Sequence, residues 1–155
     1  MSFRIRQAPD AVNAIMTIME EAFPPEYGEA WSRAQLCGML VLPRVTAWLA
    51  EDAAGSSLGF ALARQAPGEA ELLLLAVRPS ARRRGVGRQL LAAVEVQARA
   101  EGAEQLFLEM RDGNDAVHLY HLHGFGAIGR RPRYYRGVSG EQIDAITYRL
   151  RLVAT

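Results

Sequence analysis

The stretch that decides the fold runs from Leu72 to Leu91 and reads LLLLAVRPSARRRGVGRQLL. Its four consecutive leucines predict a strand that is buried on both faces, and therefore a central strand of a sheet. The strand leads into a turn rich in arginine and glycine, and the turn opens a helix. Such a turn directs backbone N–H groups at one point, where the helix dipole and the arginines add positive charge. The stretch therefore predicts a phosphate-binding site.

Length and composition restrict the classes of protein that need to be considered. The chain has 155 residues, which predicts a single domain over 1–155 with one sizeable core. Half of the residues are hydrophobic and 23% are charged, as in ordinary globular proteins. The formal net charge is +1, so no overall field attracts nucleic acid or an anionic membrane. All 18 basic residues are arginine, which excludes a lysine nucleophile or Schiff base.

The positions of cysteine and histidine and the search for a leader segment exclude further kinds of site and further classes of protein. Cys37 is the only cysteine, so an internal disulfide and a cysteine-cluster zinc site are excluded. The spacing of His118, His121 and His123 does not place all three on one face of a helix, so we predict no metal site. We find neither a basic-then-apolar leader nor an apolar run of membrane-spanning length, and we expect a cytoplasmic protein with no membrane partner.

The rest of the chain reads as alternating strands and helices. Ser32 and Gln35 form a capping box, with Trp31 and Leu36 placed as its hydrophobic staple. A strand, a crossover helix and a second strand between 70 and 110 predict a parallel pair. The order predicts an α/β or α+β fold, with helices packed on a mixed sheet. We expect strands at 3–6, 45–51, 58–64, 70–77, 105–110, 125–131 and 144–152, helices at 9–23, 32–40, 86–101 and 114–121, and a loop over 133–140.

Three phosphate-binding motifs compete for the arginine-rich turn. A Walker loop requires lysine and is excluded. A dinucleotide fingerprint requires three glycines, whereas only Gly85 and Gly87 are present and Leu90 takes the third place. The acetyl-CoA loop, Arg/Gln-x-x-Gly-x-Gly/Ala, is satisfied by Arg82–Gly87. We favour it because strand, turn and helix follow in order, over the alternative of a glycine turn with a solvated basic face.

The chain resembles the GNAT acetyltransferase superfamily over almost its whole length, and within it the RimI-type N-terminal alanine acetyltransferases of ribosomal proteins. The order and spacing of several pieces carry this resemblance. The matching pieces are Trp31-Ser32 with Gln35-Leu36, Ala76–Pro79, Arg82–Gly87, Leu108–Arg111, Leu119-Tyr120, Gly124-Phe125, Arg131 with Tyr134-Tyr135, and Asp144-Ala145.

The resemblance implies a mixed, mostly antiparallel sheet of six to seven strands with about four helices. The sheet would splay between the parallel strands that end at Val77 and Met110, and the pantetheine arm of acetyl-CoA would lie in that gap. The cofactor-binding residues implied are Leu75, Ala76 and Val77 along the arm, and Arg82, Arg83, Arg84, Gly85, Val86, Gly87 and Arg88 around the pyrophosphate.

The resemblance assigns the general base to Glu109, in a Leu-Glu-Met-Arg version of the family's Leu-Glu-Val-Arg motif. Acyl transfer to an amine requires a group that removes a proton from the protonated amine. A carboxylate at the end of a buried strand beside the cleft has surroundings that favour this role. The alternative is that Glu109 is simply paired with Arg111 or another arginine. Glu71 is a second possible base, which we rank below Glu109.

The resemblance assigns the general acid to Tyr120, in the family's Leu-Tyr pair. A phenol can donate a proton to the departing sulfur. Tyr120 can equally be a core tyrosine on a short amphipathic helix, and the two roles are compatible. A backbone N–H near Ala76 or Val77 would stabilise the oxyanion.

One cofactor contact and the acceptor side complete the implied site. The family's asparagine maps to Asn114, or to Gly113 if the gap is placed elsewhere, because the chain is one residue shorter than usual before Tyr120. Trp31, Arg131, Tyr134 and Tyr135 would line the peptide side, with surface packing as the alternative for the two tyrosines.

The acceptor implied by the resemblance is the N-terminal α-amine of a protein, possibly a ribosomal protein. A small-molecule amine, a lysine side chain, or a non-catalytic CoA-binding module are the alternatives. A nucleic-acid module is a distant alternative, because the clusters of arginine are confined to one turn and one loop, with few aromatic residues to stack bases. The oligomeric state is left open between monomer and homodimer.

Overall fold

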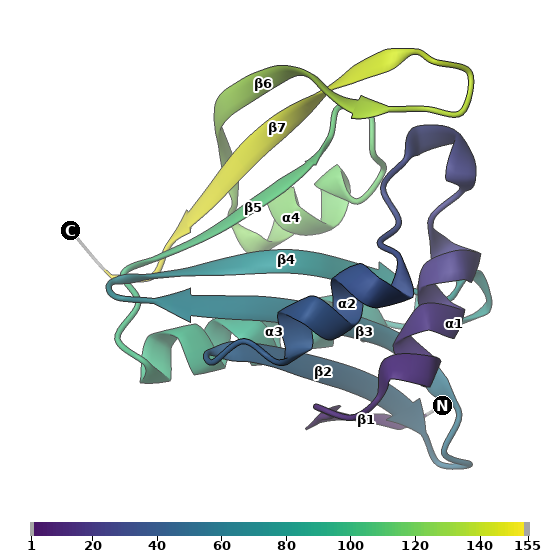
Figure 1. The fold of residues 1–155 in the computed structure, drawn as a ribbon. Helices are drawn as coiled ribbons and strands as arrows, with labels where there is room; N and C mark the ends of the chain where they lie inside the picture. Colours follow the sequence, from purple (N-terminus) through teal and green to yellow (C-terminus); the bar gives the residue numbers. More distant parts are fainter. Residues whose placement is uncertain (1, 154–155) are drawn as a thin grey trace.

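Residues 2–153, the part of the chain described by the computed structural model, contain one sheet of seven strands with helices on both faces (Figure 1). The strand order is β1-β2-β3-β4-β5-β7-β6. The strands are β1 (Phe3–Gln7), β2 (Val45–Asp52), β3 (Ser57–Ala66), β4 (Glu69–Val77), β5 (Gln105–Arg111), β6 (Gly126–Arg136) and β7 (Gln142–Arg151). The helices are α1 (Val12–Ala22), α2 (Arg33–Leu40), α3 (Val86–Ala100) and α4 (Val117–His123), with short 3₁₀ turns at Pro25–Tyr27 and Pro79–Ala81. The predicted mixed fold is confirmed.

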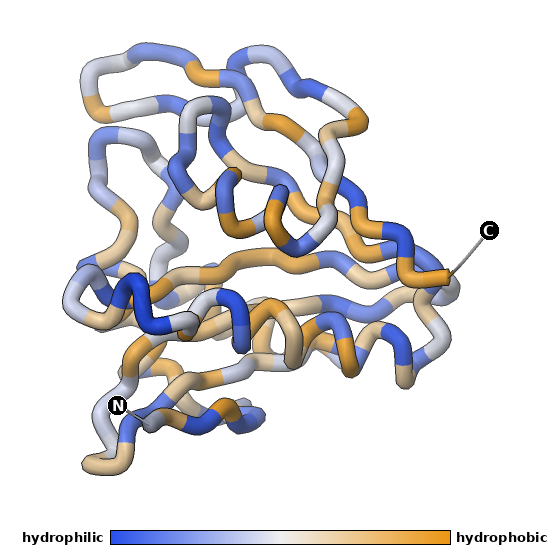
Figure 2. The backbone as a smooth tube through the Cα atoms, turned by 180° about the vertical axis from the view of Figure 1, so that it is seen from behind, coloured by the Kyte–Doolittle hydropathy of each residue, from blue (hydrophilic) through white to orange (hydrophobic). Residues whose placement is uncertain are grey.

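The helices bury their apolar faces on opposite sides of the sheet. One core cluster joins α1 and α2 to β2–β4, and a second joins α3 and α4 to the other face. Figure 2 shows the hydrophobic residues, in orange, running along the central strands. The capping box predicted for α2 is present, since the Gln35 N–H donates to Ser32 Oγ at 3.1 Å and the Ser32 N–H donates to Gln35 Oε1 at 2.7 Å. None of the helices within residues 2–153 is both long and apolar enough to cross a bilayer.

The parallel pair of strands, β4 and β5, is joined over only part of its length. Their register runs from Glu69 opposite Gln105 to Leu72 opposite Leu108 and then stops. At the same point the register of β4 with β3 shifts, and Leu73 is the extra residue of a β-bulge. The two strands diverge beyond it (Figure 1). The resemblance implied a splay between these strands, and the structure has it.

The bulge changes which way the leucines of β4 face. Leu73 and Leu74 both pack against the core cluster of α1 and α2, although consecutive strand residues ordinarily face opposite sides. Leu73, Leu74 and Leu75 are only partly buried, whereas the sequence predicts burial on both faces. The physical reason is that β5 no longer pairs with β4 at these positions, so no neighbouring strand covers the three leucines.

Three predicted boundaries are wrong. We expect a helix from 9, but residues 9 and 10 form a turn in which the Ala11 N–H donates to the Ala8 carbonyl at 3.2 Å, and α1 begins at Val12. We expect a helix from 114, but α4 begins at Val117, because the Asn114 side chain accepts the Ala116 N–H at 2.9 Å and holds a turn there. We also expect a loop over 133–140, but β6 continues to Arg136, so Tyr134 and Tyr135 lie in a strand. The strand continues because its register with β7 resumes at Tyr135 after a shift that begins beyond Arg131.

The packing of α3 generates a stability prediction. Leu90 is 0% exposed in the core, and replacing it with alanine should lower the free energy of unfolding by about 2–5 kcal/mol because a cavity remains. Val96 lies on the same helix but is 68% exposed, so Val96→Ala should change the free energy of unfolding by about 0.5 kcal/mol or less. Urea denaturation of both variants tests this, and equal effects would contradict the orientation given for α3.

Candidate active site

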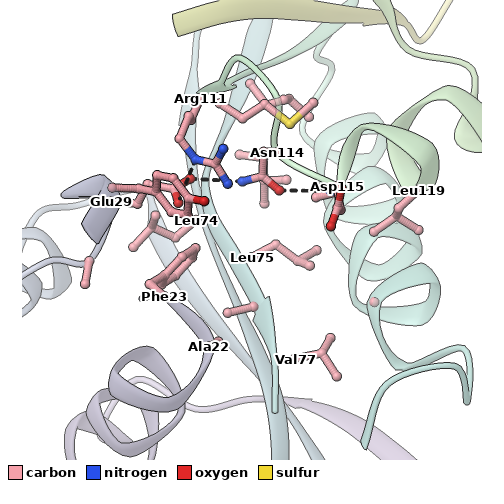
Figure 3. Close-up of a pocket in the computed structure, with 18 of the residues that line it drawn as sticks. Ala22, Phe23, Glu29, Leu74, Leu75, Val77, Arg111, Asn114, Asp115 and Leu119 are labelled. Carbon is pink, nitrogen blue, oxygen red and sulfur yellow. Dashed lines mark hydrogen bonds and ion pairs between the residues drawn. The ribbon is translucent and has the colours of Figure 1, made fainter. Parts of the chain in front are cut away.

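The gap between the parted strands is the floor of a cleft of about 1510 Å³. Its walls come from β4, the end of β5, the arginine-rich turn, α4, the loop between α1 and α2, and β6. Figure 3 shows Leu74, Leu75 and Val77 along β4 with Leu119 of α4 on the opposite side. The cleft therefore collects residues from six separate parts of the chain and is large enough for an extended ligand.

The backbone of β4 offers unpaired hydrogen-bonding groups to this cleft. The Arg78 N–H donates to the Leu58 carbonyl at 2.8 Å. This bond shows which residues of β4 direct their N–H groups toward β3. Because antiparallel neighbours alternate between bonded and non-bonded pairs, the N–H groups of Leu75 and Val77 point away from β3. They face the side where β5 pairs with β4 only as far as Leu72. A ligand that carries amide groups can therefore add to this edge.

The arginine-rich turn is shaped for a phosphate group. Arg83 and Gly85 adopt left-handed backbone angles, with φ of 65° and 81°. The first turn of α3 leaves the N–H groups of Val86, Gly87 and Arg88 without an intrahelical acceptor. A Cβ on Gly87 would come within 3.2 Å of Leu119 Cδ2, so glycine keeps this turn close to α4.

The arginines of this turn surround those N–H groups with positive charge. The side chains of Arg82, Arg83, Arg84 and Arg88 are exposed. Arg82 donates to the Val77 carbonyl at 3.3 Å and Arg84 donates to the Ser80 carbonyl at 3.3 Å, which tie the two side chains to the turn. Backbone donors, a helix N-terminus and guanidinium groups together fit a diphosphate.

Glu109 lies at the end of β5 with its side chain 21% exposed. Thr147 of β7 donates its hydroxyl to Glu109 Oε2 at 3.1 Å, and Arg131 Nε of β6 lies 2.8 Å from the same oxygen. The alternative that Glu109 pairs with an arginine is therefore present, with Arg131 as its partner. Arg111 instead pairs with Glu29. Both contacts of Glu109 engage Oε2, and Oε1 takes part in neither of them.

Tyr120 is a buried residue that also lines the cleft. Its ring packs edge-on against Phe125, with ring centroids 5.7 Å apart. Burial raises the pKa of the Tyr120 phenol far above its ordinary value, so the hydroxyl keeps its proton at neutral pH. The core interpretation of this tyrosine is confirmed, and the neutral phenol is compatible with the predicted role as acid.

The second base candidate, Glu71, has a different setting. It sits in the part of β4 that still pairs with β5, opposite Phe107. Its side chain is 42% exposed and pairs with Arg64 at 2.7 Å. Glu109 lies beyond the point where the strands separate, so the geometry favours Glu109.

Asn114 is held by a residue that the sequence analysis missed. Its Nδ2 donates to Glu29 Oε2 at 2.9 Å, and Arg111 Nε donates to Glu29 Oε1 at 3.2 Å (Figure 3). Gly113, the alternative position for the asparagine, adopts a left-handed turn with φ of 86°. Nothing in the local sequence indicates Glu29, because its partners lie more than eighty residues further along the chain.

Three of the four residues predicted for the acceptor side, Trp31, Tyr134 and Tyr135, line the mouth of the cleft, whereas Arg131 is not part of its lining. The rings of Tyr134 and Tyr135 meet edge-on with centroids 5.0 Å apart, and Arg131 lies 5.4 Å from the centroid of Tyr134. Trp31 packs against the α1–α2 core cluster and contributes to the cleft wall. Burial, reinforced by the carboxylates of Glu29 and other neighbours, raises the pKa of Tyr135 to about 12.

Two of the three histidines that raised the question of a metal have other contacts, and the third, His118, is part of the cleft lining. His121 packs edge-on against Tyr148, with ring centroids 5.9 Å apart. His123 Nε2 lies 2.6 Å from Glu95 Oε1 of α3, which helps to join α4 to α3. Within residues 2–153, no group of three histidine, cysteine or acidic side chains is arranged to hold a metal ion.

Comparison with known proteins places this geometry in context. The model of the Acetyltransferase (GNAT) family matches residues 12–125. The chain is 34% identical over 89 residues to a [ribosomal protein bS18]-alanine N-acetyltransferase of Haemophilus influenzae, covering 57% of this chain and 61% of that protein. It is 42% identical over 100 residues to the N-alpha-acetyltransferase RimI of Mycobacterium tuberculosis, covering 61% of this chain and 60% of that protein. The matched regions thus span about three fifths of the length of these relatives.

Solved structures, among them an acetyltransferase, resemble the chain over nearly its full length. The crystal structure of the ribosomal-protein-S18-alanine N-acetyltransferase from Escherichia coli superimposes with a TM-score of 0.86 and 27% identity. The superposition covers 99% of this chain and 96% of that one.

The surroundings of Tyr135 generate a prediction for alkaline pH. Its raised pKa keeps the phenol neutral at about pH 11, where a tyrosine in the unfolded chain is ionised. The stability that this phenol contributes is therefore complete below about pH 10 and falls as the pH rises toward 12. At pH ~11 the folded chain and its Tyr135→Phe variant should show equal phenolate absorbance. In denaturant the variant should show one phenolate fewer, and a difference already present between the folded proteins would contradict this assignment.

Proposed function

The chain belongs to the GNAT family of acetyltransferases, and from this premise we propose that it transfers the acetyl group of acetyl-CoA to the N-terminal α-amine of a protein. The observation that carries the proposal is the open edge of β4, which leads directly into the phosphate-shaped turn at the start of α3. The proposed acceptor is a ribosomal protein that begins with alanine, following the names of the relatives. The proposal retains the expectation of a cytoplasmic enzyme.

Residues of the cleft fit the parts of acetyl-CoA. When bound, it would supply an acyl group activated as a thioester. The N–H groups of Leu75 and Val77 are available to the amides of a pantetheine arm. The turn from Arg82 to Arg88 has the donors and charge for a diphosphate. These matches support acetyl-CoA as the co-substrate.

Glu109 is the proposed general base. An α-amine is largely protonated at neutral pH and has to lose a proton before it can attack a thioester. Arg131 and Thr147 bind Glu109 Oε2 and hold the carboxylate in one orientation. We assign proton acceptance to Oε1, which neither contact uses. Arg131, predicted to bind the acceptor, acts in this proposal through Glu109.

Tyr120 is the proposed general acid. The leaving sulfur requires a proton, and the neutral phenol of Tyr120 carries one at its Oη. Its ring packs against Phe125 in the core, which holds the residue in place at the cleft wall. Of the two oxyanion donors expected, the Ala76 N–H points toward β3 and the Val77 N–H points into the cleft, so Val77 is the proposed donor. Acid and base thus come from α4 and β5, on one side of the parted strands.

Tyr134, Tyr135 and Trp31 are the proposed contacts for the acceptor chain. They line the mouth of the cleft from β6 and from the start of α2. Tyrosine and tryptophan offer large, stiff surfaces with one polar group each, which suits contact with a peptide.

The proposal is tested by following thiol release from acetyl-CoA with an alanine-initiated peptide. Glu109→Gln and Tyr120→Phe should each lower kcat roughly 100-fold, the scale of a lost general base or acid, while CoA affinity stays unchanged. Matched controls are Glu101→Gln at the end of α3 and Tyr148→Phe, a buried tyrosine outside the cleft lining. Both should retain wild-type turnover.

The same assay, run with peptides whose N-termini are free or acetyl-blocked, identifies the class of acceptor. Turnover with free but not acetyl-blocked N-termini supports the α-amine. Turnover with blocked peptides that contain lysine, or only with small amines, would replace this acceptor. CoA binding without turnover on any amine would contradict the enzyme and leave a CoA-binding module.

A further inference from the structure

Glu29 is a buried carboxylate to which the proposed reaction gives no role. Its side chain is 8% exposed, although it lies in the loop between α1 and α2. Burying a carboxylate is costly unless charged or polar donors surround it. Here Arg111 donates to Oε1 at 3.2 Å and Asn114 donates to Oε2 at 2.9 Å, so both oxygens are used (Figure 3). Two side chains, Arg111 and Asn114, thus donate to one loop residue at the mouth of the cleft.

Each donor lies in, or just before, an element that carries a proposed catalytic group. Arg111 is the last residue of β5, two positions after Glu109, and its guanidinium also lies 3.7 Å from the ring centroid of Tyr27. Asn114 accepts the Ala116 N–H with its side-chain oxygen and the Val117 N–H with its carbonyl, at 2.9 and 3.2 Å. These bonds start α4, the helix of Tyr120.

The loop that carries Glu29 is anchored on both sides of the cleft. On one side it follows α1, which packs on β3 and β4. On the other, the Val138 N–H donates to the Glu26 carbonyl at 3.1 Å, and a Cβ on Gly28 would come within 2.3 Å of the Arg136 carbonyl. The loop therefore crosses from the β4 side to the β6 side of the cleft with little freedom to move.

We propose that Glu29 is a positioning residue for acetyl transfer, which sets the end of β5 and the start of α4 relative to each other. The inference rests on the proposed function, because it takes Glu109 and Tyr120 as base and acid. One carboxylate contacts both elements, so a shift of Glu29 displaces both groups together. Displacements of about 1 Å in a catalytic site can cost 100-fold in rate.

The test compares Glu29→Ala and Glu29→Gln with Glu20→Gln, an exposed carboxylate on α1 outside the cleft lining. We expect Glu29→Ala to lower kcat roughly 10- to 100-fold with the KM for acetyl-CoA changed by less than about twofold. Glu29→Gln should retain more activity than Glu29→Ala, because its amide oxygen still accepts from Asn114 while the charge opposite Arg111 is lost. Glu20→Gln should match the wild type.

A second readout follows the positioning itself in the ligand-free protein. Amide hydrogen exchange at Ala116 and Val117 should accelerate in Glu29→Ala, because Asn114 loses the partner that orients it. Exchange at core amides such as Leu106 should not change. Glu20→Gln should leave all of these rates unaltered.

The outcomes separate this inference from the proposed function. Unchanged kcat and exchange in both Glu29 variants would overturn the inference while the function stands. A higher KM for the peptide at unchanged kcat would also overturn it, since Glu29 would then simply contact the acceptor. If Glu29→Ala does not fold, wild-type kcat in Glu29→Gln overturns it. A wild-type chain inactive on every amine would remove the proposed function, and the exchange rates would still decide whether Glu29 positions α4.

Discussion

The structure depends on the separation of β4 from β5 after Leu72 and Leu108. A sheet ordinarily pairs every internal strand along its length, because unpaired buried N–H and C=O groups cost free energy. Here the Leu73 bulge turns β4 away from its parallel neighbour and leaves part of its backbone facing a cleft. The arginine-rich turn follows the same strand directly. An unsatisfied sheet edge and an anion-binding helix start therefore lie in one continuous line, which matches a ligand with amides at one end and phosphates at the other.

An open cleft in the middle of a sheet has to be held open by other contacts. Arg78 at the end of β4 pairs with Glu21 of α1 at 2.7 Å. At the other wall, Arg131 and Thr147 reach Glu109 from β6 and β7. Glu29 connects the loop after α1 to the end of β5 and the turn before α4. Glu29 thus joins the two walls through side chains where the backbone no longer does, and the proposed catalytic groups lie on the joined elements.

Local patterns in the sequence predict much of this architecture. The capping box at Ser32 and the turn from Arg82 to Gly87 depend on residues close together in the chain, so their signals are visible without a fold. The contacts of Glu29 and the pairing of Glu109 with Arg131 join distant segments, and no local pattern reveals them. The sequence predicts the start of α4 three residues too early for a related reason, since the side-chain bond of Asn114 competes with helix propensity there. The resemblance supplied the catalytic assignments, which composition and spacing alone could not.

Amide hydrogen exchange along β4, with and without CoA, tests the central claim most directly. The N–H groups of Leu75 and Val77 should exchange fast in the free protein and slow when CoA is added. Those of Leu74 and Ala76 point toward β3 and should be protected in both states, which provides the internal control. Protection of Leu75 and Val77 without CoA would mean that the two strands are joined there. Absence of any change on CoA binding would place the ligand elsewhere, and either result would contradict the account.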